Sequence, residues 1–130
     1  MKVKSSVRSK STVSSNPFAE FREECRKQLQ QSLIRLYPKL IIPAFSFEIP
    51  PTSEFGELAS SICFDLARTL KLQPLKLAEE IIQTMDKSKF SLIKAVKSAG
   101  AGYINFYADY VKLAWLAVEA ARKQASYGYV

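Results

Sequence analysis

The chain has 130 residues, of which 48% are hydrophobic and 24% are charged. These values are close to those of soluble globular proteins and are sufficient for one compact domain with its own core. No apolar run approaches the roughly 20 residues that cross a bilayer, so we predict no membrane segment.

The net charge of +7 is unevenly distributed along the chain. Residues 1–16 contain four basic residues and no acidic residue, so this stretch supplies +4 and the rest of the chain supplies only +3. A basic balance favours a polyanionic partner, because lysine and arginine attract phosphate. The folded part is only mildly basic, so charge alone is a weak pointer to nucleic acid.

Residues suited to catalysis are scarce. The sequence contains no histidine, which removes the commonest general base and the usual metal ligand. It also lacks a glycine-rich phosphate loop, a nucleophile elbow and a Cys-x-x-Cys pair. We therefore predict that this chain is not an enzyme on its own and holds no cofactor or metal. Cys25 and Cys63 each lie among apolar residues at helical intervals, which favours buried free thiols and a cytoplasmic setting over a disulfide.

The chain divides into an arm and a folded domain. Residues 1–16 are rich in serine and lysine and are predicted to form a disordered basic arm, with a transit peptide as the alternative. The domain is predicted over residues 17–130. It opens at Asn16-Pro17, an N-cap residue followed by proline at the first helical position, and the first helix ends at Tyr37-Pro38. Its apolar stripe recurs at steps of three and four: Phe18, Phe21, Cys25, Leu29, Leu33 and Leu36.

The later segments mix both kinds of element. Residues 45–49 alternate between apolar and polar side chains, which predicts a strand. A second helix is predicted from a cap at Thr52 or Ser53, with the stripe Phe55, Leu58, Ile62, Leu66 and Leu70. A third helix begins at Pro74, strands are predicted over 91–97 and 103–108 around the glycine turn 100–102, and a final helix runs from about 109 to about 123. The fold class is therefore α+β, a small antiparallel sheet packed against four or so helices in a single domain.

The strand over residues 103–108 presents two different faces. Ile104, Phe106 and Ala108 form an apolar face that is predicted to meet the helices. Tyr103, Asn105 and Tyr107 are predicted on the other, exposed face. Aromatic rings stack on unpaired bases and an asparagine amide reads a base edge, so these three residues could hold one nucleotide. The alternative is that this pattern only covers a sheet face.

Four motifs resemble the N-terminal domain of arginyl-tRNA synthetases. Residues 100–107 (GAGYINFY) resemble that family's Gly-Pro-Gly-Phe/Tyr-Ile-Asn-Phe signature. Pro50-Pro51 and residues 55–59 (FGELA) look like its proline pair and Phe-Gly-Asp-Tyr-Ala element. Residues 73–81 (QPLKLAEEI) are similar to its Asn-Pro-x-x-Ile-Ala-Glu-Glu-Ile helix start, and Tyr127-Gly128 sits where the family chain passes toward its catalytic domain. The resemblance runs from about residue 18 to the C-terminus.

The resemblance implies an α+β module that grips the outer corner of tRNA(Arg) and reads a nucleotide in the D-loop. The ring and the amide of that contact match Tyr103 and Asn105. Lys94 and Lys97 are expected to supply phosphate contacts on grounds of charge. The resemblance also implies a partner, the catalytic domain of arginyl-tRNA synthetase in cis or in trans, which would use ATP. Because that domain's His-x-Gly-His-type element is absent, we expect either a piece of a longer product or a free-standing relative. We also expect the chain to be a monomer.

Some residues depart from the family pattern, and one alternative function stays open. Ala101 stands where the family has proline, which predicts a less rigid turn, and Glu57 stands where it has aspartate. The alternative is a protein-interaction module, in which the final helix with Trp115 faces a partner. The ordinary explanation of that apolar helix is packing against the sheet or against the catalytic domain.

Overall fold

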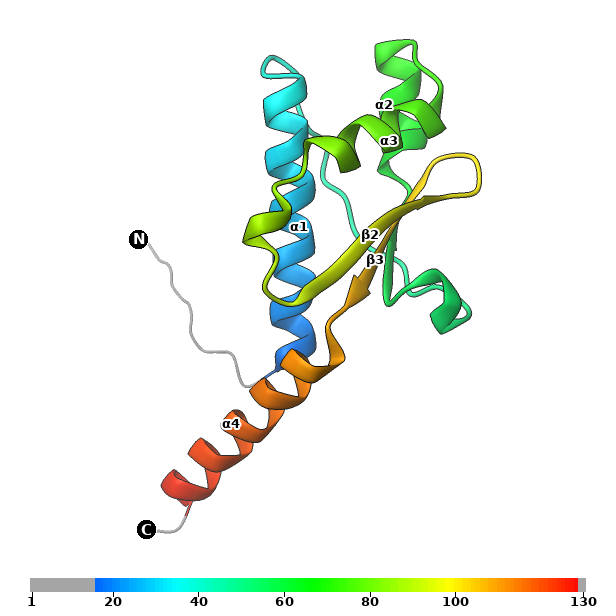
Figure 1. Ribbon diagram of the computed structural model, residues 1–130. Coiled ribbons are helices and arrows are strands. Elements are labelled where there is room, and N and C mark those ends of the chain that lie inside the picture. Colours follow the sequence, from blue (N-terminus) through cyan, green and yellow to red (C-terminus); the bar gives the residue numbers. More distant parts are fainter. Residues whose placement is uncertain (1–15, 129–130) are drawn as a thin grey trace.

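The computed structural model describes residues 16–128, with side chains described as far as Lys123. The predicted arm over residues 1–16 therefore lies outside the described residues, except for Asn16. Within the described residues the elements are α1 (Pro17–Leu36), η1 (Ser53–Phe55), β1 (Leu58–Ser60), α2 (Ile62–Leu70), α3 (Pro74–Thr84), η2 (Lys87–Lys89), β2 (Ile93–Ala99), β3 (Tyr103–Ala108) and α4 (Tyr110–Gly128). Four α-helices and a small antiparallel sheet in this part of the chain confirm the α+β class (Figure 1).

Helix α1 begins and packs as its sequence predicts. The Asn16 side-chain oxygen accepts hydrogen bonds from the backbone N–H groups of Phe18 at 3.1 Å and Ala19 at 3.2 Å, which satisfies two donors that a helix start leaves free. Farther along, the Ser32 hydroxyl donates to the Ile81 carbonyl, and Arg35 donates to the Thr84 carbonyl at the end of α3. These bonds fix α3 alongside α1. The stripe that faces the core comprises Phe21, Cys25, Leu29 and Leu33.

The predicted second helix is wrong over its first half. Gly56 has a φ of +87°, and the next residues, Leu58–Ser60, form strand β1 and pair with β3. Helix α2 begins only at Ile62. The spacing of Phe55, Leu58 and Ile62 fits a helix, but pairing with β3 satisfies the backbone of this buried stretch and overrides that local preference.

Of the predicted strand over residues 45–49, only one isolated β-bridge forms. Glu48 and Ala59 exchange two backbone hydrogen bonds, of 2.9 and 2.8 Å, while neighbouring residues of this segment belong to no named strand of the described chain. Phe47 nevertheless faces the core, where its ring meets that of Phe106 edge-on at 5.5 Å. The bridge lays the segment before Pro50 beside β1.

Strand β3 lies at the centre of the sheet, in the order β1-β3-β2, and both of its neighbours are antiparallel to it. The hairpin between β2 and β3 turns through Gly100–Gly102, as predicted. Helices α1, α2 and α3 pack against the sheet (Figure 1). Ile104, Phe106 and Ala108 are buried in this core, so the predicted apolar face is confirmed.

Both cysteines are free and buried, as the sequence predicts. Burial raises the pKa of the Cys63 thiol to about 12 and raises the pKa of Cys25 as well, because an apolar setting disfavours the thiolate. Thiols of this kind act as small apolar side chains rather than as nucleophiles.

Helix α4 projects away from the rest of the domain (Figure 1). Leu113 and Leu116 pack against the core, but Val111, Trp115 and Val118 are 50–70% exposed. Of the two explanations offered for the apolar final helix, packing against the sheet is therefore wrong for these three residues, because they stay exposed. The other explanation stays a prediction. Among the described helices, none is long and apolar enough to cross a membrane.

Candidate nucleic-acid interface

A cavity of about 350 Å³ opens beside the start of β3. This volume lies within the range of small-molecule sites, about 300–1,000 Å³, and is many times that of one water molecule. One wall comes from β1, β3 and the end of β2, and the other comes from the segment around the proline pair and from η1. The lining residues are Glu48, Ile49, Pro50, Pro51, Phe55, Ala59, Ala99, Gly100, Tyr103 and Asn105.

Asn105 lies in the wall of this cavity, but it is only 3% exposed. The prediction that it stands on an exposed face is therefore wrong. The bridge between Glu48 and Ala59 places an additional chain segment beside the sheet, and that segment walls the face to which Asn105 belongs. The sequence showed the alternation of side chains, but it did not show this cover.

The side-chain oxygen Oδ1 of Asn105 is buried and has no hydrogen-bond partner. Nearly all buried polar atoms in proteins have a partner, and an acceptor left without one costs about 1–3 kcal/mol. No other buried side-chain nitrogen or oxygen in the described part of the chain is unpartnered in this way. An unpartnered acceptor at a cavity wall is suited to a ligand that brings a donor.

Tyr103 also lines the cavity and is 38% exposed. Its ring packs edge-on against the ring of Phe64 in α2, with the centroids 5.0 Å apart and an angle of 72° between the planes. This contact fixes the ring while part of its surface stays open to solvent. The structure thus brings together Tyr103 and Asn105, the ring and the amide that the sequence singled out.

Tyr107 is not part of the cavity lining. Its hydroxyl donates to the backbone carbonyl of Glu54 at 2.9 Å, and the Lys97 ammonium lies 5.1 Å from the centroid of its ring. Tyr107 therefore supports η1, whose Phe55 lines the cavity, instead of offering a free ring to a base. The predicted trio is divided into two lining residues and one supporting residue.

The two predicted phosphate-binding lysines lie outside the cavity, on β2. Lys97 lies directly opposite Asn105 in the β2–β3 register, so it borders the site on the side away from β1. Lys94 lies where the register shifts between Ile93 and Ala95. Both lysines are exposed.

Of the lining residues, only Tyr103 and Asn105 were assigned to the site from the sequence, and Glu48 and Phe55 are among those that were missed. Glu48 was read as a polar position of a strand and Phe55 as part of a helical stripe. The signal that could have found them is the proline pair that stands between them, because Pro50-Pro51 belongs to one of the four motifs that resemble the family.

Known proteins match this chain over the same region. The family described as "Arginyl tRNA synthetase N terminal domain" matches residues 23–108. The arginine–tRNA ligase of Thermotoga maritima is 32% identical over 104 residues, which are 79% of this chain and 18% of that protein. The arginine–tRNA ligase of Thermococcus sibiricus is 40% identical over 73 residues, which are 56% of this chain and 11% of that protein. The chain belongs to the arginyl-tRNA synthetase N-terminal domain family.

Solved structures of arginyl-tRNA synthetases share the fold. The Plasmodium falciparum enzyme superposes with a TM-score of 0.57 at 15% identity, over 68% of this chain and 16% of that one. The Thermus thermophilus enzyme superposes with a TM-score of 0.56 at 18% identity, over 68% of this chain and 14% of that one. The matched region spans less than one fifth of the length of the Thermotoga maritima and Thermococcus sibiricus arginine–tRNA ligases.

Glu57 joins the sheet to α4. One of its carboxylate oxygens accepts the backbone N–H of Ala108 at 2.6 Å, and the other accepts the Tyr110 hydroxyl, a bond that raises the pKa of Tyr110. The resemblance identified this position as a departure from aspartate. Its carboxylate holds the junction between β3 and α4 and is not part of the cavity lining.

A larger groove, of about 680 Å³, runs between α1 and α4. It is lined by Glu20, Glu23 and Glu24 and by Lys27, Lys89 and Lys112, so its charges balance. Glu24 is already engaged, because its carboxylate accepts the backbone N–H groups of Ser91, Leu92 and Ile93 at the start of β2. This groove offers no selective chemistry for an anionic ligand.

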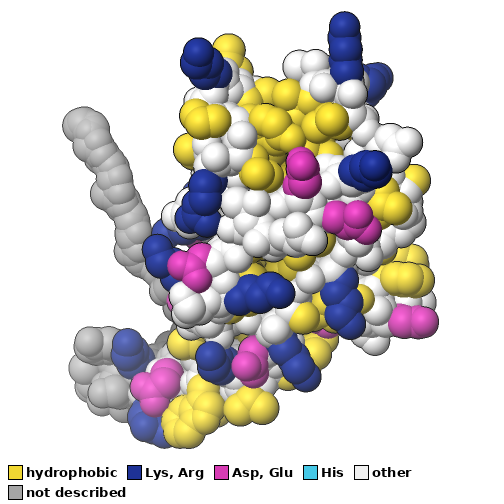
Figure 2. All heavy atoms as spheres, turned by 45° about the horizontal axis from the view of Figure 1, so that its top comes forward, with side chains coloured by type: hydrophobic (Ala, Val, Ile, Leu, Met, Phe, Trp, Pro, Cys, Tyr) yellow, Lys and Arg dark blue, Asp and Glu magenta, His cyan; other side chains and the backbone are white. Residues whose placement is uncertain are grey.

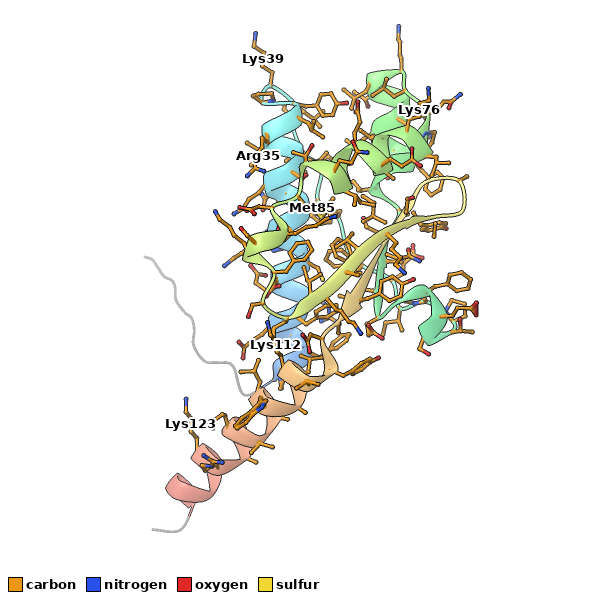
Figure 3. All side chains as sticks on the ribbon, viewed as in Figure 1. Arg35, Lys39, Lys76, Met85, Lys112 and Lys123 are labelled. Atoms are coloured by element: carbon orange, nitrogen blue, oxygen red, sulfur yellow. The ribbon has the colours of Figure 1, made fainter. Side chains whose placement is uncertain are left out.

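Positive charge is dispersed over the face of the chain that Figure 2 shows. Figure 2 shows lysine and arginine side chains spread between acidic and apolar ones on one face, without a continuous basic patch. Lys39 and Lys76 point outward at one end of the domain, and Lys123 lies on α4 at the other (Figure 3). Residues 16–128 contain no group of three or more cysteine and acidic side chains placed to hold a metal ion.

Proposed function

We propose that this domain captures one unpaired nucleotide of the tRNA(Arg) D-loop in the cavity beside β3. The observation that carries the proposal is the buried, unpartnered Oδ1 of Asn105 in the cavity wall. A base that enters the cavity would bring an N–H donor to this oxygen, which has no partner in the described chain. Sequence-specific RNA recognition commonly uses such splayed-out bases.

Each residue of the site has a distinct role in this proposal. The Tyr103 ring stacks on the base, a contact worth about 1–3 kcal/mol. The Asn105 amide reads the base edge, since it offers both a donor and an acceptor. Lys97, next to Asn105, and Lys94, farther along β2, contact the phosphates that flank the nucleotide. Tyr107 supports η1, which supplies Phe55 to the cavity wall.

The domain performs no chemistry in this proposal. It orients tRNA(Arg) for arginylation by the ATP-dependent catalytic domain of an arginyl-tRNA synthetase, joined in cis or acting in trans, in the cytoplasm. The relatives are arginine–tRNA ligases more than five times longer than the matched region, which supports such a division of labour.

The test is a titration of the 130-residue chain with a tRNA(Arg) transcript and with a transcript that is changed only at the captured D-loop nucleotide. We expect weaker binding to the changed transcript, and we expect Asn105→Ala to abolish this difference. Tyr103→Phe, which keeps the ring, is the matched control and should preserve it. Equal binding of both transcripts to the unaltered chain would refute base readout at this cavity.

The lysine contacts are tested by salt dependence. Lys97→Gln should weaken binding to both transcripts alike and reduce the slope of log K against log salt by about 0.7–0.9, the contribution of one phosphate contact. Lys94→Gln should do the same. Lys123→Gln, at the far end of α4, serves as the control that leaves the slope unchanged. An unchanged slope in the β2 variants would remove these lysines from the interface.

The exposed apolar side of α4 supports a second contact, with the catalytic domain. Val111, Trp115 and Val118 recur at helical intervals and are at least half exposed, an arrangement more typical of an interface than of a free surface. We expect the isolated domain to be a monomer by light scattering. Trp115→Glu should leave binding of tRNA unchanged and weaken association with a separately produced catalytic body. Self-association of the chain through this helix would contradict the assignment.

A further inference from the structure

Glu48 is a second polar residue in the wall of the nucleotide cavity. Its backbone is paired with Ala59, and Ala59 lies opposite Asn105 in the β1–β3 register. Directly opposed residues of antiparallel strands project to the same face of a sheet. Glu48, Ala59 and Asn105 therefore stand in one row, and all three line the cavity.

The row combines two acceptors with a gap between them. The small side chain of Ala59 separates the Glu48 carboxylate from the Asn105 amide, across two strand spacings or about 10 Å. Asn105 contributes the buried oxygen without a partner, and a carboxylate offers acceptors alone. Glu48 forms no ion pair with a described residue, so its carboxylate is free to meet a ligand.

We infer that Glu48 sets the base preference of the cavity, selecting a base with an exocyclic amino group over uracil. This inference rests on the proposed function, because it assigns a preference to the same cavity. Cytosine presents an N–H₂ donor where uracil presents a carbonyl oxygen. The carboxylate accepts a hydrogen bond from the first and repels the second, so the discrimination has both an attractive and a repulsive part.

The same row orients the nucleotide. Lys97 lies opposite Asn105 on the side away from Ala59, so the row has a carboxylate on one side of the amide and an ammonium on the other. A nucleotide is matched to this polarity when its base edge faces Glu48 and its phosphate lies near Lys97. The reverse orientation brings phosphate toward a carboxylate.

The test uses two tRNA(Arg) transcripts that differ only by cytosine or uracil at the captured D-loop position. The two bases have the same ring size, so stacking on Tyr103 is matched. The unaltered chain should bind the cytosine transcript about tenfold more tightly, the effect of one good base contact. Glu48→Gln should bring the ratio close to one, because the amide can donate to the uracil oxygen. Glu54→Gln removes a nearby negative charge outside the cavity lining, so it should keep the ratio.

The outcomes separate this inference from the proposed function. If Asn105→Ala abolishes selective binding but Glu48→Gln leaves the ratio unchanged, the cavity is the site and the role of Glu48 is wrong. A lack of cytosine preference in the unaltered chain overturns the inference in the same way. If Asn105→Ala changes neither the affinity nor the ratio between the two transcripts, the cavity is not the site. The proposed function and this inference are then both wrong. Thermal unfolding of each variant, followed by circular dichroism, confirms that the compared chains are folded.

Discussion

The hydroxyl group of Tyr107 donates a hydrogen bond of 2.9 Å to the backbone carbonyl of Glu54. This bond joins the central strand to η1, and η1 supplies Phe55 to the cavity wall. The sequence predicted Tyr107 as a second ring that stacks on a base, yet its hydroxyl group is bonded within the domain. The bond therefore makes Tyr107 a supporting residue of the pocket.

We expect Tyr107→Phe to lower the free energy of unfolding by about 1 kcal/mol, the net worth of one hydrogen bond. The ring and its contact with Lys97 remain, so the base preference should be unchanged and the affinity should fall only slightly. Urea denaturation and titration with tRNA(Arg) measure the two quantities. A variant of unchanged stability that loses its base preference would mean that the Tyr107 hydroxyl contacts RNA.

Replacement of Asn105 should affect stability and RNA binding in different ways. Asn105→Leu replaces a buried amide, whose oxygen lacks a partner, with an apolar side chain of similar size. Removing an unsatisfied buried polar group is neutral or favourable, so we expect stability to stay level or rise by about 1 kcal/mol. Selective binding of the D-loop nucleotide should be lost. A loss of several kcal/mol on urea denaturation would instead identify Asn105 as a structural residue.

The sequence predicted the structure correctly where a local pattern is compatible with only one kind of element. Asn16-Pro17 marked the start of α1, and the alternation of Ile104, Phe106 and Ala108 identified the buried face of β3. In both places the local preference and the tertiary packing agree. The residues of the central strand could therefore be assigned to faces before the structure was known.

The parts that could not be predicted depend on contacts between distant segments. Leu58 has the spacing of a helical residue, but it lies in a strand because β3 needs an edge partner. The cavity that Asn105 lines takes its other wall from residues 48–51 and Phe55, which lie about 50 residues earlier in the chain. No periodicity within β3 carries this information. The cavity exists because of such pairings, so the sequence suggested two of its residues but not its walls.

Gly56 is required by its surroundings as well as by its backbone. Its φ is +87°, and a Cβ atom at this position would lie 2.6 Å from the carbonyl oxygen of Phe106. Because that oxygen belongs to the backbone of the central strand, it cannot move aside without disturbing the sheet. We expect Gly56→Ala to lower the free energy of unfolding by roughly 2–4 kcal/mol, from backbone strain and overpacking together.

Gly100→Ala is the matched control for this prediction. Gly100 also has a positive φ, +56°, but a Cβ atom there would meet only the Tyr103 ring at 3.7 Å, an ordinary contact. Its cost should be limited to the left-handed conformation, about 1–2 kcal/mol. Urea denaturation of both variants gives the comparison. Equal losses would show that the close approach of Gly56 to β3 adds nothing.

The two buried thiols should make the domain less stable at alkaline pH. The Cys63 thiol has a pKa of about 12 in the folded chain, compared with an ordinary value of 9.0, because burial disfavours the thiolate. The folded state therefore holds the proton more tightly than the unfolded state. The resulting stabilisation is fully present below pH 9 and is lost as the pH rises toward 12. Within this window each pH unit should remove about 1.4 kcal/mol per thiol.

Comparison with Cys63→Ala isolates this effect, since the lysine and tyrosine titrations are common to both chains. The unaltered chain should lose stability more steeply than the variant above pH 9, so the difference between their free energies of unfolding should change by about 1.4 kcal/mol per pH unit. Urea denaturation at half-unit steps from pH 8 upward measures it. A difference that stays constant across this range would mean that Cys63 ionises as readily in the folded chain as in the unfolded one. That result would contradict the complete burial of Cys63 on α2.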